Sequence, residues 1–157
     1  FFDRVYKSHG IELEASLRFN EFFVNGGLTW TDAEISKDDI SPANEGNTPR
    51  RQADVVYQLT GGYAAANWTL GANIIGTGDA YAQDNNQLVM PGYTQVNLFA
   101  DYRFAENWVV GLNVNNLFDT FGITESEEGG IVANTENIIR ARSIPGRTAS
   151  LSVRYEF

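Results

Sequence analysis

The strict alternation of apolar and polar side chains in the last eleven residues, RTASLSVRYEF, constrains the fold more than any other feature of the sequence. From Ala149 onward one parity is apolar and ends on Tyr155 and Phe157, whereas serine, arginine and glutamate occupy the other. A β-strand points alternate side chains to opposite faces, so the stretch predicts one apolar and one polar face. A tilted strand of about nine to eleven residues crosses a bilayer. We therefore expect a transmembrane strand with its terminal aromatics at the membrane interface.

Six earlier segments show the same alternation, each bounded by a short turn or by a polar stretch. In one of them Leu98 and Ala100 alternate with Asn97 and Asp101. In another the parity changes at Leu117, which predicts a β-bulge near Asn115–Asn116. The expected strands are residues 10–20, 22–34, 53–65, 68–77, 93–104, 108–119 and 147–157.

The connections between these strands alternate strictly between short and long. Three have two or three residues, and three have about eleven to twenty-six, mostly polar. Outer-membrane barrels have short periplasmic turns and long extracellular loops. The pattern therefore predicts a last strand that runs toward the periplasm and three long connections outside the cell.

Aromatic residues gather at the short-turn ends of the expected strands, all on the apolar parity. Such clustering at one height predicts an interfacial girdle, and a soluble β-sandwich gives no reason for it. The fold class that we expect is all-β, an antiparallel up-and-down transmembrane β-barrel segment of about seven strands. The girdle residues are Phe19, Phe22, Tyr63, Trp68, Phe104, Trp108, Tyr155 and Phe157.

Composition excludes several other classes of protein. The net charge of −9 argues against a nucleic-acid partner, because nucleic acids select basic surfaces. The mean hydropathy of −0.28 and the lack of a long apolar run argue against a membrane-spanning helix. The chain has no cysteine and one histidine, His9, and no nucleophile elbow, P-loop or dinucleotide fingerprint. We expect no enzyme activity, no metal site and no cofactor.

Four stretches resemble the C-terminal end of TonB-dependent outer-membrane receptors. They are NVNNLFD at 113–119, PGR at 145–147, the closing YEF at 155–157 and SHGIELE at 8–14. The resemblance implies a barrel of about 22 strands around a plug domain, of which this chain is the C-terminal portion without plug or earlier strands. The chain starts at Phe1 without a signal peptide, so we expect a mature or truncated piece.

The resemblance also implies a function and partners. Such receptors sit in the bacterial outer membrane and import a scarce, bulky nutrient, of the ferric siderophore, cobalamin or oligosaccharide class. The implied partners are outer-membrane lipid and lipopolysaccharide, the receptor's own plug, the TonB complex and a small-molecule ligand. The terminal aromatics Tyr155 and Phe157 resemble the signal that the barrel assembly machinery recognises.

Charged residues on the polar parity near the short-turn ends form a predicted lumen belt. This belt would pair with the plug, or its members would pair with one another along the wall. Apolar Val56, Ile75 and Phe99 share the inward parity, which suggests that something packs inside the barrel. The belt residues are Arg18, Asp101, Arg103, Arg154 and Glu156.

Candidate ligand residues lie in the long connections and at their junctions with the strands. Arg50, Arg51, Arg140 and Arg142 suit an anionic ligand or lipopolysaccharide phosphates, or simply charge the rim. Aromatic residues there stack on a ligand or form an outer girdle; they are Tyr81, Tyr93 and Phe121. Acidic residues either bind a cation such as calcium or face solvent; they are Asp32, Glu34, Asp38, Asp39, Glu125, Glu127 and Glu128.

Two other classes of protein stay open at this point. A passive, porin-like barrel has the same strand pattern but no plug upstream. A soluble secreted β-sandwich buries its apolar faces against a second sheet and purifies without detergent.

Overall fold

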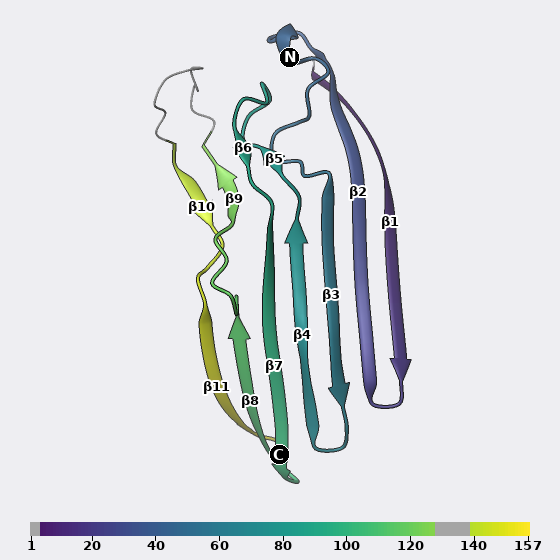
Figure 1. Cartoon of the computed structure of the whole chain (residues 1–157), viewed down its shortest axis with the longest axis vertical. Helices are drawn as coiled ribbons and strands as arrows, with labels where there is room; N and C mark the ends of the chain where they lie inside the picture. Colours follow the sequence, from purple (N-terminus) through teal and green to yellow (C-terminus); the bar gives the residue numbers. More distant parts are fainter. Residues whose placement is uncertain (1–3, 128–138) are drawn as a thin grey trace.

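The computed structural model describes residues 4–127 and 139–157. Seven long strands lie side by side in chain order and form one antiparallel sheet (Figure 1). They are β1 (Arg4–Phe19), β2 (Phe22–Asp38), β3 (Val55–Ala64), β4 (Trp68–Thr77), β7 (Tyr93–Ala105), β8 (Trp108–Asn115) and β11 (Thr148–Tyr155). This arrangement confirms the predicted all-β, up-and-down architecture.

Short turns lie at one end of the sheet, together with the C-terminus, and long connections lie at the other (Figure 1). The turn between β1 and β2 is tight because Asn20 adopts the left-handed conformation, with a φ of 52°. The long connections contain the hairpin β5 (Ala80–Tyr81) with β6 (Val89–Met90) and the hairpin β9 (Ile123–Ser126) with β10 (Ala141–Ser143).

One helical element occurs in the described residues, the 3₁₀ turn η1 (Pro42–Asn44). No helix in this part of the chain is long and apolar enough to cross a bilayer.

The register of the sheet aligns the apolar parity of all seven strands on one face. Leu98 pairs with Val114, which in turn pairs with Ala149, and Leu112 lies opposite Leu151. These side chains are open to the surroundings: Leu151 is 72% exposed and Leu112 46%. No second layer of the described chain covers this face, whereas the sandwich alternative predicts that a second sheet would bury it.

Two local predictions can be compared with the structure in detail. The strand β8 ends at Asn115, and Asn116 follows with a left-handed φ of 51°. The Leu117 N–H still donates to the Val96 carbonyl of β7 at 2.8 Å, one residue out of the Leu98–Val114 register. This extra residue agrees with the irregularity predicted near Asn115–Asn116. A further register irregularity lies between Arg103 and Ala105 on β7.

The first hairpin is longer than its alternation predicted. β1 begins at Arg4 and β2 continues to Asp38, so the hairpin rises well above the expected segments 10–20 and 22–34. Its upper part carries charged residues on both faces, where the apolar pattern stops. The extension therefore places the hairpin end among the outer loops.

Buried side chains concentrate at the long-loop end of the molecule. Ile35 and Ala82 are fully buried, and Met90 is 5% exposed. In the short-turn half, Val109 is the only buried hydrophobic residue among those that the structure describes. The sheet thus has a small core outside the membrane region and almost none within it.

Candidate functional site

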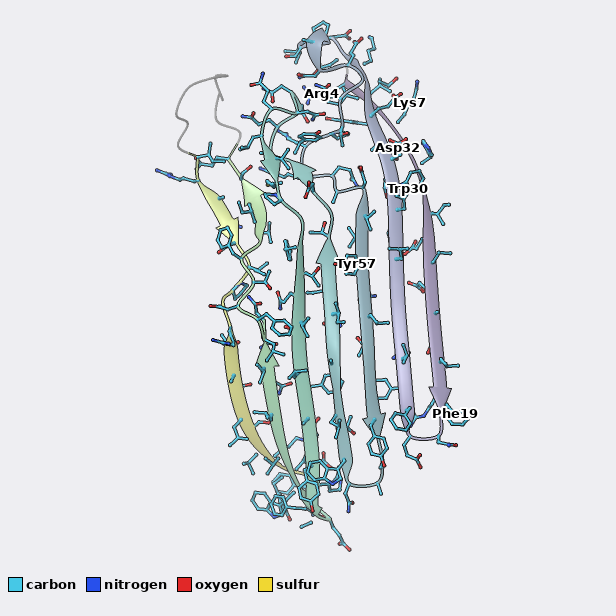
Figure 2. All side chains as sticks on the ribbon, in the orientation of Figure 1. Arg4, Lys7, Phe19, Trp30, Asp32 and Tyr57 are labelled. Carbon is cyan, nitrogen blue, oxygen red and sulfur yellow. The ribbon has the colours of Figure 1, made fainter. Side chains whose placement is uncertain are left out.

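Aromatic rings gather in a band at the short-turn end of the sheet, where Figure 2 shows many rings close together. The ring centroids of Trp68 and Tyr102 are 4.2 Å apart, and those of Trp108 and Tyr155 are 4.9 Å apart. Phe157 continues the band 5.0 Å from Tyr155. Tyr102 was not included in the girdle predicted from the sequence, although it shares the apolar parity of Phe104. The band has the position and composition of an interfacial girdle.

Four of the five predicted belt residues lie together just inside this girdle. Arg103 Nη2 and Glu156 Oε2 are 2.8 Å apart, and Arg154 Nε lies 3.1 Å from Glu156 Oε1. Asp101 lines the same hollow as Arg103 and Arg154. The wall-to-wall pairing that the sequence left open is therefore present, and contact with a plug stays a prediction.

The fifth belt residue, Arg18, lies elsewhere. It is on β1, opposite Phe23, in a cross-strand row that reaches Phe99 on β7. Arg103 lies four positions further along β7 and belongs to another row. Equal distance from a short turn does not bring side chains together when several strands separate them.

The inner face of the sheet between Arg18 and the belt carries polar side chains and, over two glycines, aromatic rings. Asn73 Nδ2 donates to Thr60 Oγ1 at 2.9 Å, and Asn97 Nδ2 donates to Asn73 Oδ1 at 3.2 Å, which links three strands. The rings of Phe23 and Phe99 lie over Gly62 and Gly71, where any Cβ would collide with them. Glycine there lets aromatic rings lie flat along the wall.

At the opposite end Arg4 ties two long connections together. Its guanidinium lies 2.6 Å from the Asp38 carboxylate and 2.7 Å from that of Asp84. Figure 2 shows Arg4 and Lys7 far along the sheet from Phe19. Burial raises the pKa of Asp38, but the backbone N–H of Ser41 and the Arg4 guanidinium more than offset this, so the pKa lies below its usual range.

Arg50 and Arg51 precede β3 and hold neighbouring connections through their backbone. The N–H of Arg50 donates to Asp84 Oδ1 at 3.0 Å, and that of Arg51 donates to the Tyr81 carbonyl at 2.7 Å. Arg51 has a φ of 61°, in the left-handed region that non-glycine residues rarely adopt. Its guanidinium donates to the Ser126 carbonyl at 2.8 Å, so Arg51 contacts all three long connections.

Arg51, Arg140 and Arg142 converge around a hollow of about 320 Å³, which we call the arginine hollow. Arg51 Nη1 lies 3.4 Å from Glu125 Oε1, and Arg142 Nη1 lies 3.3 Å from Glu125 Oε2. Arg140 lies 3.6 Å from Glu127. The described residues that line it are Arg51, Glu125, Ser126, Glu127, Arg140, Ala141 and Arg142.

The three candidate aromatic residues of the long connections do not form a group. Tyr93 points inward by parity, opposite Thr77, and its ring lies against Gly122. Tyr81 is in β5, and Phe121 is 74% exposed. Tyr93 therefore belongs to the inner wall, not to an outer girdle.

Two buried polar residues were not predicted as important. Asn116 is 1% exposed; its amide donates to the carbonyls of Thr120 and Pro145 at 2.9 and 3.0 Å and accepts the N–H of Thr120. These bonds tie the end of β8 to the start of β11. The motif NVNNLFD, which contains Asn116, could have indicated its importance, whereas no sequence feature singled out Ser126.

The acidic residues of the connections do not assemble a metal site in the described part of the chain. No three histidine, aspartate or glutamate side chains there approach one another closely enough to hold a metal ion. Asp38 and Glu125 instead face guanidinium groups. Glu128 lies outside the described residues.

Comparison with known proteins gives a consistent result. Residues 2–117 match the family model described as TonB dependent receptor-like, beta-barrel. The metal-pseudopaline receptor CntO of Pseudomonas aeruginosa is 31% identical over 119 residues, which cover 72% of this chain and 17% of the relative. The chain thus spans about a sixth of the length of the curated relatives that it matches.

Solved structures share the fold at lower identity. The siderophore receptor PiuA from Acinetobacter baumannii superposes with a TM-score of 0.84 at 22% identity, over 97% of this chain and 22% of that one. The ferric yersiniabactin uptake receptor FyuA from Yersinia pestis gives 0.81 at 19% identity, over 98% and 24%. At these identities the likeness concerns the fold alone.

Proposed function

Because this chain belongs to the TonB-dependent receptor β-barrel family, we propose that it forms the C-terminal wall of a receptor that imports a scarce, bulky metal chelate. The family is one of outer-membrane transport receptors of Gram-negative bacteria, not of enzymes. The observation that carries the proposal is the uncovered apolar face, which runs across all seven strands and ends in an aromatic girdle.

The edges of the sheet support the view that this is part of a larger barrel. Among the described strands, β1 and β11 each pair with one neighbour, on opposite edges of the sheet. Open sheet edges do not occur in the hydrocarbon region of a membrane. Further strands of the same protein would pair with both edges and complete a barrel of about 22 strands, the number that plugged transporters have.

The names of the similar proteins favour one ligand class among the three that the sequence left open. One is a receptor for metal-pseudopaline and several are siderophore or ferric-chelate receptors. A metal chelate is therefore favoured over cobalamin or an oligosaccharide.

We assign roles to the two ends of the wall accordingly. The residues at the outer end that contact the ligand or lipopolysaccharide are Arg50, Arg51, Tyr81, Arg140 and Arg142. Tyr93 contacts the ligand from the inner wall. The inner belt contacts the plug, which the TonB complex moves; its residues are Asp101, Arg103, Arg154 and Glu156, and Arg18 faces the lumen apart from them. The barrel assembly machinery recognises Tyr155 and Phe157.

Energy-dependent uptake tests the proposal. Cells that lack the gene encoding this chain, and cells complemented with the complete gene, are starved of metal and given a labelled chelate. We expect accumulation only in the complemented cells, and its loss when an uncoupler collapses the proton gradient. Uptake that survives the uncoupler would instead indicate a passive, porin-like barrel.

The belt is tested separately with Arg103→Glu in the complete receptor. The change removes the ion pair with Glu156 and reverses the charge that faces the lumen. We expect weaker uptake with normal ligand binding. Unchanged uptake would remove the plug role and leave the belt as a wall contact.

A further inference from the structure

The arginine hollow is cationic in a chain that is otherwise acidic. Among the residues that the structure describes, three guanidinium groups and two carboxylates line it, a formal charge of +1 from 3 − 2, whereas the whole chain carries −9. The groups come from the segment before β3 and from the hairpin β9–β10, far apart in the sequence. A local excess of arginine at such a mouth attracts anions against the field of the rest of the chain.

Glu125 lies between two of these guanidinium groups without binding either tightly. Its two oxygens are 3.4 Å from Arg51 and 3.3 Å from Arg142. Charge-assisted N–H···O bonds are usually about 2.7–2.9 Å long. The Arg142 side chain is 83% exposed. A stronger oxyanion can therefore take the place of this carboxylate at little cost.

Arg51 is held ready for such an exchange. Its backbone N–H is fixed by Tyr81, and one guanidinium nitrogen is fixed by the Ser126 carbonyl. The left-handed φ of 61° at Arg51 places its side chain at the hollow. Backbone outliers of this kind concentrate at functional sites, and a pre-set arginine loses little freedom when a ligand binds.

Ser126 supplies a second, independent observation. The residue lines the hollow and is 2% exposed. Its hydroxyl has no hydrogen-bond partner among the residues that the structure describes. A buried polar group without a partner is costly, and a hydroxyl can donate to an oxyanion.

We propose that the arginine hollow is a subsite for an oxyanion, a carboxylate or a phosphate, and that Glu125 holds the place which this group takes. The inference rests on the proposed function when the oxyanion belongs to the imported chelate. Phosphates of lipopolysaccharide offer the same chemistry from a second source, and the two sources are separable by experiment.

The test uses the complete receptor, purified in detergent without lipopolysaccharide and titrated calorimetrically with citrate and with inorganic phosphate. We expect saturable binding that Arg142→Gln weakens by about tenfold, the usual effect of a charged hydrogen bond. Glu125→Gln should tighten binding by a similar factor, because it removes the competing carboxylate. Lys7→Gln is the matched control, since Lys7 is 70% exposed and pairs only loosely with Glu34, at 3.7 Å; it should leave binding unchanged.

A second arm replaces the soluble probes by purified lipopolysaccharide. Binding of lipopolysaccharide that responds to Arg142→Gln and Glu125→Gln, without citrate binding, assigns the subsite to the membrane lipid. Absence of saturable binding by all probes, or binding that neither variant alters, overturns the proposal. Variants that lower thermal stability alone would show that the Arg–Glu contacts only hold the hairpin together. Import that continues without oxyanion binding refutes this inference and leaves the proposed function standing, whereas binding without import refutes the proposed function.

Discussion

The two ends of this sheet are held together by different means. The short-turn half is stabilised mainly by backbone pairing and by its outward apolar face. Large residues such as Leu151 are buried there only when lipid surrounds them. At the long-loop end, Ile35 and Ala82 form a small core, and Arg4 and Arg51 join separate connections. The membrane thus supplies the apolar surroundings for one half, while the other half depends on particular side-chain pairs.

The largest effect is expected from a charge on the lipid face. Leu112→Arg places a guanidinium on the outer face of β8, and such changes near the middle of a membrane cost about 2–4 kcal/mol. Asn113→Arg, the next residue and on the inner face, should cost much less. Urea unfolding of the complete receptor in vesicles measures both. Equal effects would contradict the assignment of lipid and lumen faces.

A buried carboxylate at the outer end comes next. Asp38→Asn removes the ion pair with Arg4 and weakens the link between two connections. Hydrogen exchange of residues 35–54 and 78–92 should accelerate by about tenfold or more, as expected for a lost charged hydrogen bond. Exchange in the sheet around Leu112 serves as the control and should not change. Acceleration throughout the protein would mean that the two ends are not separate.

Arg51→Gly distinguishes the contribution of the Arg51 side chain from that of its backbone, also at the long-loop end. Glycine accepts the positive φ of 61° without strain, so the variant keeps the backbone and loses the side-chain contacts, among them those to Ser126 and Glu125. Exchange in β9 should rise by about tenfold. Protection that is unchanged in this variant would show that Arg51 does not hold the hairpin.

Acid should loosen the outer end without any mutation. The pKa of Asp38 is lowered in the folded protein, so its stabilising contribution is complete above the unfolded-state pKa of about 3.9. The contribution is lost as pH falls through the lower, folded pKa. Exchange of residues 35–54, corrected for the intrinsic pH dependence, should therefore stay constant from about pH 7 to pH 5 and rise a few-fold below about pH 4. A rise already near pH 6 would point to a different group.

The smallest effect is expected at the short-turn end. Asn20→Gly keeps a residue that tolerates the φ of 52° and removes no tie between strands, so stability should change by less than about 0.5 kcal/mol. Asn20→Ala should cost about 1 kcal/mol, because alanine is disfavoured in the left-handed region. Thermal unfolding of both variants is the measurement. A large loss in the glycine variant would show that this turn does more than reverse the chain.

The same contrast explains what the sequence predicted. A period of two assigns each residue within the seven strands to a face, so the strands, the apolar and polar faces and the girdle followed from alternation. The contacts of Arg51 with Ser126 and Glu125 join residues 75 and 74 positions apart, and no local pattern indicates such pairs. Arg18 failed to join the belt for a similar reason, because turn distance does not encode the separation between strands.

The triple contact of Arg51 has a consequence for how such receptors diversify. A connection that shares one arginine with two others cannot be exchanged alone without leaving its neighbours unsupported. New specificity would then arise when all three long connections are inherited together. Chimaeras between relatives should therefore be joined within the strands, not at the tips of individual loops.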